Sequence, residues 1–506
     1  MADSRTKNAA RNIVFGFLNK FVSLILPFVT RTLILYLLGK NYLGIGTLFS
    51  SILSFLSLTE LGVGAAIVYS MYKPIAEKDD DRICALLNFY KNMYRLIGGA
   101  VLAIGTVILP FIPFLTKGDV PAEMNIYILY YLYLINSVIS YFCFGYKRSI
   151  LVADQRSDIT SNINTVIGLV VQIGQVFLLY LTKNFYVYAF VPIVGTVINN
   201  LSVAIVTKKK YPQYTGRGTL DKSIKKEILD KITGLFGTKL NTVVVHSSDV
   251  IVLSAYLGLG VTAMYGNYHY IMNSVCGFVM MFFSSMTAGI GNKIVTDTLE
   301  ESYALFKKLS FVNFWIVGCG SVAFLCLYEP FMKLWMGKDM LLGFPFVVCM
   351  VLYFFVYEIQ RTIFAFKDAV GLWQKDKLRP YVSMLINIVG NLVLINFFGV
   401  SGVVIATMLS FLLTLPWLNG ILFKNLFTNV KPSENLFRIF GYFIVTVIAC
   451  VATYLPTMLL GDSYLDFGIR ILMCIVIPNV IFTLIFFRKP EFKYFVKRMK
   501  KLIKRH

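Results

Sequence analysis

The chain has 506 residues, of which 57% are hydrophobic and only 15% are charged, and its formal net charge is +22. A soluble globular domain carries about 25% charged residues, so this composition excludes an intrinsically disordered protein and a soluble multidomain enzyme. It indicates an all-α polytopic membrane protein with little of its mass outside the bilayer.

About fourteen apolar stretches are long enough to cross a bilayer, which takes about 20 mostly apolar residues. The alternating strands of a membrane β-barrel are only about 10 residues long, so these continuous stretches predict helices. The first stretch follows a short basic segment and has no small-residue cleavage site, which favours a membrane helix over a signal peptide. In chain order the predicted spans are 12–38, 41–68, 96–116, 124–146, 159–182, 184–207, 240–260, 264–292, 309–328, 340–366, 380–398, 399–423, 439–460 and 471–487.

The distribution of basic residues predicts that both termini face the cytoplasm. With the N-terminus inside, the segments on that side hold 36 of the 48 Lys and Arg residues, the opposite loops hold 6, and the remaining 6 lie in or beside spans. Cytoplasmic segments of membrane proteins carry such an excess. The net charge is therefore mainly a topology signal, and nucleic-acid binding is not predicted. The basic tail predicts an amphipathic segment on anionic lipid, with docking of a cytoplasmic partner as the alternative.

The chain is similar to itself at a shift of roughly 220 residues. Residues 32–46 (TLILYLLGKNYLGIG) and 250–266 (VIVLSAYLGLGVTAMYG) both contain an apolar helix, a Leu-Gly turn and the start of another helix. This predicts two six-helix bundles in parallel orientation, with a substrate site at their interface, followed by two extra helices. The alternative explanation of this self-similarity is that apolar membrane helices resemble one another in general. The predicted divisions are an N-terminal bundle at 1–207, a cytoplasmic linker at 208–238, a C-terminal bundle at 239–423, helices 13 and 14 at 424–487, and a basic cytoplasmic tail at 488–506.

Titratable residues inside predicted spans are costly, so each requires an explanation. Lys20 and Arg31 are eleven residues apart, about three helical turns, and share roughly one helix face. The others of this set are Glu60 on the second span and Lys239, His246 and Asp249 on the seventh. Together they predict a net basic lining of a cavity between the bundles, suited to an anionic substrate. Structural ion pairs between helices, such as Arg31 with Glu60, are the alternative.

Two further charges lie near the cytoplasmic end of the tenth predicted span. Glu358 and Arg361 are three residues apart and therefore adjacent on one helix face. Either a pair within the helix or a contact at a gate explains them.

One sequence stretch resembles a known family. TELGVGAAIVYSMYKPIAEKDD from Thr59, with RTLILYLLGKNYLGIG from Arg31, resembles the polysaccharide-biosynthesis branch of the multidrug/oligosaccharidyl-lipid/polysaccharide (MOP) exporter superfamily, which contains the Wzx-type flippases. The resemblance implies a flippase of the bacterial cytoplasmic membrane, not an enzyme. Its substrate would be an undecaprenyl-diphosphate-linked oligosaccharide, moved from the inner to the outer leaflet by alternating access. The implied partners are this glycan, membrane lipids and a polysaccharide polymerase.

The resemblance also implies roles for single residues. Arg31 would be the first substrate contact, and Lys20 and Lys239 would add cationic donors for the diphosphate. Glu60 and His246 would complete the lining. The coupling ion would be Na⁺ or H⁺, with no other cofactor, and the implied cation site consists of Asp249, Asn387, Asn391, Val403 and Thr407. Asn391 stands where the family has an acid. Asparagines that pack between helices are the alternative to a cation site.

Other functions are less well matched by the sequence. There is no Walker A motif, no metal-hydrolase spacing and no carboxylate pair for glycosyl transfer. A multidrug-type exporter would favour an acidic cavity, whereas the deep charges here are mostly basic. A membrane-embedded polymerase would carry a large external loop, and no predicted outside loop exceeds about 15 residues. A lipid II flippase differs from the favoured function only in its substrate.

Overall fold

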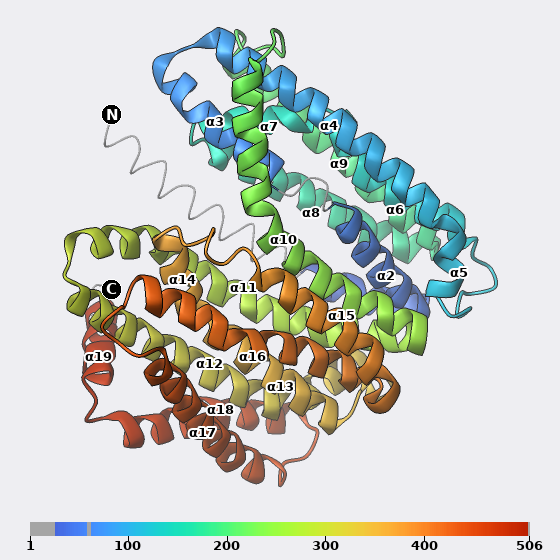
Figure 1. Cartoon of the computed structure of the whole chain (residues 1–506). Coiled ribbons are helices and arrows are strands. Elements are labelled where there is room, and N and C mark those ends of the chain that lie inside the picture. The colour runs from blue at the N-terminus through green and yellow to red at the C-terminus, as the bar shows by residue number, and fades with distance from the viewer. Residues whose placement is uncertain (1–25, 58–61, 504–506) are drawn as a thin grey trace. The chain divides into compact units, whose positions relative to one another are not determined.

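The computed structural model describes residues 26–57 and 62–503, and Figure 1 shows this part of the chain as helices joined by short connections. No strand occurs among these residues. The predicted all-α fold is confirmed. The chain divides into two compact units, which we call the first unit (Met1–Ala263) and the second unit (Met264–His506). The internal repeat, and the division into an N-terminal bundle up to residue 207 and a C-terminal bundle from residue 239, are not tested by the structure and stay predictions.

The first unit is a bundle in which α4 packs on α6, α9 packs on α6 and α8, and α10 packs on α2. A 3₁₀ turn, η3 (Gly145–Lys147), joins α6 to α7 at a bend of 52°. The other helical bounds are Leu26–Leu37, α2 (Lys40–Leu56), α3 (Val63–Glu77), α4 (Asp80–Ile108), α5 (Ile112–Leu115), α6 (Ile126–Phe142), α7 (Arg148–Ala153), α8 (Ser157–Thr182), α9 (Phe185–Lys210) and α10 (Lys222–Leu257).

The second unit is organised around α12, which packs on α13, α17 and α18, while α15 and α16 form an antiparallel pair. Its core is rich in phenylalanine: Phe306 meets Phe366 edge-on with ring centroids 5.2 Å apart. The bounds are α11 (Leu259–Thr296, which begins just before the unit), α12 (Leu299–Met336), α13 (Phe344–Ile359), α14 (Arg361–Ala369), α15 (Arg379–Phe398), α16 (Val400–Asn425), α17 (Pro432–Thr457), α18 (Tyr464–Phe486) and α19 (Pro490–Ile503).

The chain is a multi-pass membrane protein. The described residues contain eleven helices that are long and apolar enough to cross a membrane, or twelve if the bent pair α6 and α7 is one span. The first two predicted spans lie partly outside the described residues. On α8 the exposed side chains include Val166, Val170, Ile173 and Phe177, which recur at the spacing of one helix face. Such an outward apolar stripe is stable where the surrounding solvent is hydrocarbon.

Polar residues at the ends of the spans fix where several helices begin. The Asn125 side chain accepts hydrogen bonds from the first turn of α6, and Asn184 does the same for α9. Each such cap is worth about 1 kcal/mol, because it satisfies N–H groups that the helix leaves unpaired. Asp79 caps α4, so this helix starts at Asp80 rather than near residue 96, where the predicted apolar span begins.

The amphipathic tail helix α19 packs partly against protein. Phe492 and Phe495 lie beside Trp315 of α12, with ring centroids 5.7 and 5.3 Å away. Lys308 lies over the ring of Tyr494 at 5.0 Å. The aromatic side of the tail therefore has a protein partner, and its contact with lipid stays a prediction.

We expect the pairing of α15 with α16 to depend on Gly402. A Cβ there would overlap the backbone carbonyl group of Leu394, whereas a Cβ on Gly420 of the same helix would meet nothing within 4 Å. Gly402→Ala should lower the unfolding free energy by about 1–3 kcal/mol, because the helix backbone cannot move aside freely. Gly420→Ala should be neutral or stabilising by up to about 1 kcal/mol. Thermal unfolding in detergent measures both, and equal midpoints would contradict the close approach.

Candidate functional site

Arg31 lies on the helix Leu26–Leu37 of the first unit, beside tyrosines of two other helices. Its charge acts on the phenol groups of Tyr133 on α6 and Tyr188 on α9. The Arg31 side chain is only partly exposed. A guanidinium stays protonated in any such environment, so the helix carries a permanent positive charge next to the phenols.

Aromatic rings from α2, α6 and α9 extend from this point and form what we call the aromatic wall: Tyr42, Phe49, Tyr133, Phe185 and Tyr188. Phe185 stacks on Tyr188 at 5.2 Å and meets Tyr42 edge-on at 5.3 Å. Phe49 meets Tyr133 edge-on at 5.5 Å. The wall gives Arg31 flat apolar neighbours that also carry hydroxyl groups. Sequence reasoning missed it, because aromatics in apolar spans usually form core.

The other predicted substrate residues are spread over the first unit and beyond the described part of the chain. Lys20 and Glu60 lie outside the described residues, and so does the alternative ion pair of Arg31 with Glu60. Lys239, His246 and Asp249 lie on α10. Asp249 is fully buried and His246 is partly exposed. Their role in lining a cavity stays a prediction.

Four of the five predicted cation-site residues lie together in the second unit. The side-chain amide of Asn387 donates to the hydroxyl of Thr407 at 2.9 Å, and this hydroxyl donates to the Val403 carbonyl at 3.0 Å. The amide of Asn391 donates to the side-chain oxygen of Asn387 at 3.4 Å. None of the four is exposed to solvent.

The ligand atoms of this cluster are oxygens, which hard cations prefer, but none of the four residues carries a formal charge. The charge would have to come from Asp249, which belongs to the first unit. The hydrogen bond from Asn387 to Thr407 also joins α15 to α16, which agrees with the alternative that the asparagines serve helix packing and not cation binding. Among the described residues no group of three or more His, Cys, Asp or Glu side chains could hold a metal ion.

Glu358 and Arg361 form a pair within one membrane span, which is interrupted at Gln360. The guanidinium donates two hydrogen bonds of 2.8 Å to the carboxylate, and Glu358 is not exposed at all. Arg361 also lies over the Tyr357 ring at 4.6 Å. The pair sits where α13 ends at Ile359 and α14 begins at Arg361. The intrahelical contact is thus present, and a role as a gate stays a prediction.

A buried charge cluster in the connection from α14 to α15 was missed by sequence reasoning, which placed residues 367–379 in a cytoplasmic loop. Asp376 accepts from Lys367 at 2.7 Å and from Arg379 at 2.6 and 2.8 Å. All three side chains are at most 2% exposed. Burial acts to raise the pKa of Asp376, but the hydrogen bonds and charges of Arg379 and Lys367 outweigh it, so this pKa lies below its usual value.

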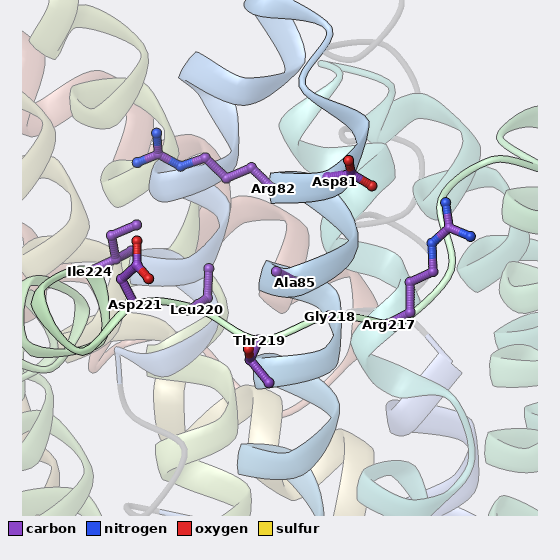
Figure 2. A pocket seen from close by; sticks show the side chains of 9 residues that line it. All are labelled: Asp81, Arg82, Ala85, Arg217, Gly218, Thr219, Leu220, Asp221 and Ile224. Atoms are coloured by element: carbon purple, nitrogen blue, oxygen red, sulfur yellow. The ribbon is translucent and has the colours of Figure 1, made fainter.

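A hollow of about 490 Å³ lies between the start of α4 and the connection that leads into α10 (Figure 2). The amide of Asn88 on α4 holds this connection by donating to the Gly218 carbonyl at 2.8 Å. Arg82 and Arg217 line the hollow, but Figure 2 shows the Arg82 side chain extending to the left and that of Arg217 extending upward at the right, so their guanidinium groups lie far from each other in this view. Asp81 and Asp221 balance their charge. The hollow therefore offers no convergent binding group, and we assign it no function.

Comparison with known proteins by sequence gives no match: no family model matches the chain, and no curated protein sequence is significantly similar. Comparison by structure gives 22 matches, and the solved structures described below, at 18% sequence identity or less, have the fold of MOP superfamily transporters.

The inward closed conformation of the lipid II flippase MurJ matches with a TM-score of 0.71 at 18% identity, covering 94% of this chain and 99% of that one. An inward-facing multidrug resistance MATE transporter matches with a TM-score of 0.59 at 15% identity, covering 78% and 93%. A MOP superfamily transporter from Pyrococcus furiosus matches with a TM-score of 0.52 at 14% identity, covering 82% of this chain and 95% of that one. These solved neighbours are flippases and transporters.

We expect the buried charge cluster to depend on Asp376. Asp376→Asn leaves buried Arg379 without a carboxylate and leaves buried Lys367 with only the half-exposed Asp368, so it should lower the unfolding free energy by about 3–5 kcal/mol. Because the pKa of Asp376 is lowered in the folded state, the stability from this cluster is present at neutral pH and is lost as the pH falls through the folded pKa. The acid branch of the stability curve should therefore be flatter in the variant.

The control is Asp368→Asn, since Asp368 is 45% exposed and lies 3.5 Å from Lys367. It should change stability by no more than about 1 kcal/mol. Melting temperatures between pH 3 and pH 8 measure both variants. Equal losses in the two variants would show that the buried cluster contributes no more than a surface pair.

Proposed function

We propose that this chain is a flippase that moves an undecaprenyl-diphosphate-linked oligosaccharide across the bacterial cytoplasmic membrane. The observation that carries the proposal is the match to a lipid II flippase along 94% of this chain and 99% of that chain. The MATE transporters cover less of this chain and superpose with lower scores. A flippase of a lipid-linked sugar therefore accounts for more of the chain than a multidrug exporter does.

The surroundings of Arg31 support the same substrate class. A diphosphate is bound best by a guanidinium, which can donate two parallel hydrogen bonds to its oxygens. Sugar rings present C–H faces that pack on aromatic rings, and their hydroxyls bond to phenols. Arg31 beside the aromatic wall supplies both kinds of contact. A cationic drug would be repelled by Arg31.

A lipid II flippase is the second candidate, because the solved structure that matches with a TM-score of 0.71 is that of a lipid II flippase. Both candidates place an isoprenoid diphosphate in the membrane and differ in the sugars. The predicted topology, with both termini cytoplasmic, is the same for both candidates and does not separate them.

We expect alternating access between the two compact units, driven by an ion gradient or by the membrane potential. Moving one charge across the membrane is worth about 2.3 kcal/mol per 100 mV. Asn387, Asn391, Thr407 and the Val403 carbonyl would hold a coupling Na⁺ together with Asp249. The neutral oxygens would replace its water, and the carboxylate would balance its charge.

The proposed substrate contact predicts the phenotype of Arg31→Ala. In a strain that lacks this gene, the wild-type chain should restore surface polysaccharide. Arg31→Ala should instead leave the lipid-linked oligosaccharide in the inner leaflet, because the diphosphate loses its cation. We expect at least a tenfold loss of transport, since charged hydrogen bonds are worth about 1.5–3 kcal/mol.

Arg31→Lys keeps the charge without the planar fork and should rescue transport in part. Lys183→Ala, at an exposed loop position, is the matched control and should behave as wild type. Normal surface polymer together with changed drug sensitivity would favour the multidrug exporter. A trapped lipid-linked cell-wall precursor, with surface polysaccharide intact, would favour the lipid II flippase.

The cation site predicts that transport loses its sodium dependence when its oxygens are removed. Asp249→Asn and Thr407→Val should each raise the sodium concentration for half-maximal transport at least tenfold. The control is Thr414→Val on the same helix, because Thr414 donates only within its own helix, to Ser410 and Phe411 carbonyls. Transport by proteoliposomes in a sodium series is the measurement. An unchanged sodium response in Asp249→Asn would assign the asparagines to packing.

A further inference from the structure

We propose that the first unit binds the headgroup of an anionic phospholipid at what we call the basic cluster: Lys91, Arg95, Lys147 and Lys208. The cluster lies apart from Arg31, and its function does not depend on the proposed flippase activity. Two of its members come from α4, one from η3 and one from the end of α9.

The bend after α6 brings these residues together. Phe144 adopts a left-handed backbone conformation with φ of +58°, and the chain turns by 52° into η3 and α7. This turn packs η3 against both α4 and α9. As a result the charges of Lys91 and Lys208 act on Lys147, and that of Arg95 acts on the neighbouring Tyr146. Lys147 also lies over the Phe144 ring at 5.3 Å.

No carboxylate among the described residues pairs with any member of the basic cluster. The two acids that follow Lys147 along the chain are engaged elsewhere: Asp154 with Tyr211, and Asp158 with Arg156. Like charges held together repel one another, which destabilises the fold unless an anion joins them. The second unit solves the same problem internally, since Asp376 bridges Lys367 and Arg379.

The basic cluster also marks the end of an apolar outer surface on each element. On α4, Arg95 directly precedes Leu96, which is 69% exposed, and further exposed apolar residues follow up to Val107. On α9, Lys208 comes one turn after Ile205, which is 65% exposed. Before Lys147, the exposed rings are Phe142 and Phe144.

A ligand of this surface therefore needs an anionic group joined to an apolar body. Phospholipids with a net negative headgroup have this structure, and a basic residue near such a membrane surface contributes about 1 kcal/mol of attraction. The predicted topology puts the cluster on the cytoplasmic side, where the other basic segments also lie.

The test is lipid binding by the full-length chain in neutral detergent. Phosphatidylglycerol is titrated, with phosphatidylcholine of the same chain length and glycerol phosphate as parallel arms. Melting temperature and native mass spectrometry report binding. The variant is K91Q/R95Q/K147Q/K208Q. The matched control is K222Q/K226Q/K375Q/K377Q, which removes four exposed lysines from other segments.

We expect phosphatidylglycerol to stabilise the wild type and the control equally, and its apparent affinity to fall at least tenfold in the variant. The effect should weaken as salt rises. K91Q/K208Q, with two charges removed, should lie in between and serves if the fourfold variant does not fold. The proposal is overturned if the variant binds phosphatidylglycerol like the wild type, if phosphatidylcholine binds equally well, or if glycerol phosphate alone gives the same stabilisation.

Discussion

The hydrocarbon of a membrane offers no hydrogen bonds, so each polar group in a span must find its partner within the protein. Many hydroxyl groups turn back to their own helix: Thr47 donates to the Leu43 carbonyl at 2.9 Å. Amides reach across instead: Asn200 donates to Ser140 at 3.1 Å and so joins α9 to α6. Polar residues thereby specify which helices are neighbours, a choice that apolar packing in lipid leaves open.

The same requirement explains how a broken helix is tolerated. Between α13 and α14 the regular ladder is interrupted at Gln360. Asn313 of α12 donates to the Glu358 and Ile359 carbonyls at 2.9 and 3.1 Å, which supplies the partners that the break removes. The pair of Glu358 with Arg361 sits on this break. Asn313 thus ties α12 to the end of α13, and the ion pair ties α13 to α14 across the interruption.

Much of the fold could be predicted from the sequence, because spans are determined by local composition. Long apolar stretches gave the helices, and the absence of alternation excluded strands. The partner of a polar or charged side chain can lie on another helix or loop, so local composition does not predict it. Lys367 and Arg379 read as loop cations, and nothing in their spacing showed that Asp376 would bury both.

Single site residues show the same limit. The resemblance implied a cation site that includes Asn387 and Thr407; in the structure these two residues are hydrogen-bonded, and the cation site itself stays a prediction. The place of Arg31 beside Tyr133 and Tyr188 needed three helices to be packed first. The start of α4 was missed because a cap at Asp79 extends a helix through residues that are too polar to count as a span.

Charge is arranged differently in the two units, and this bears on how a flippase could be coupled. In the second unit the cations Arg361, Lys367 and Arg379, of which the last two are buried, have carboxylate partners within 3 Å, and the oxygen cluster around Thr407 is neutral. The first unit keeps the basic cluster open to anions and places Arg31 beside phenols. On the proposed function, the anionic substrate would contact Arg31 of the first unit, whereas the coupling cation would need neutral oxygens of the second unit and the carboxylate of Asp249 in the first. Two ligands can drive one cycle only if each favours a particular arrangement of the same two bodies.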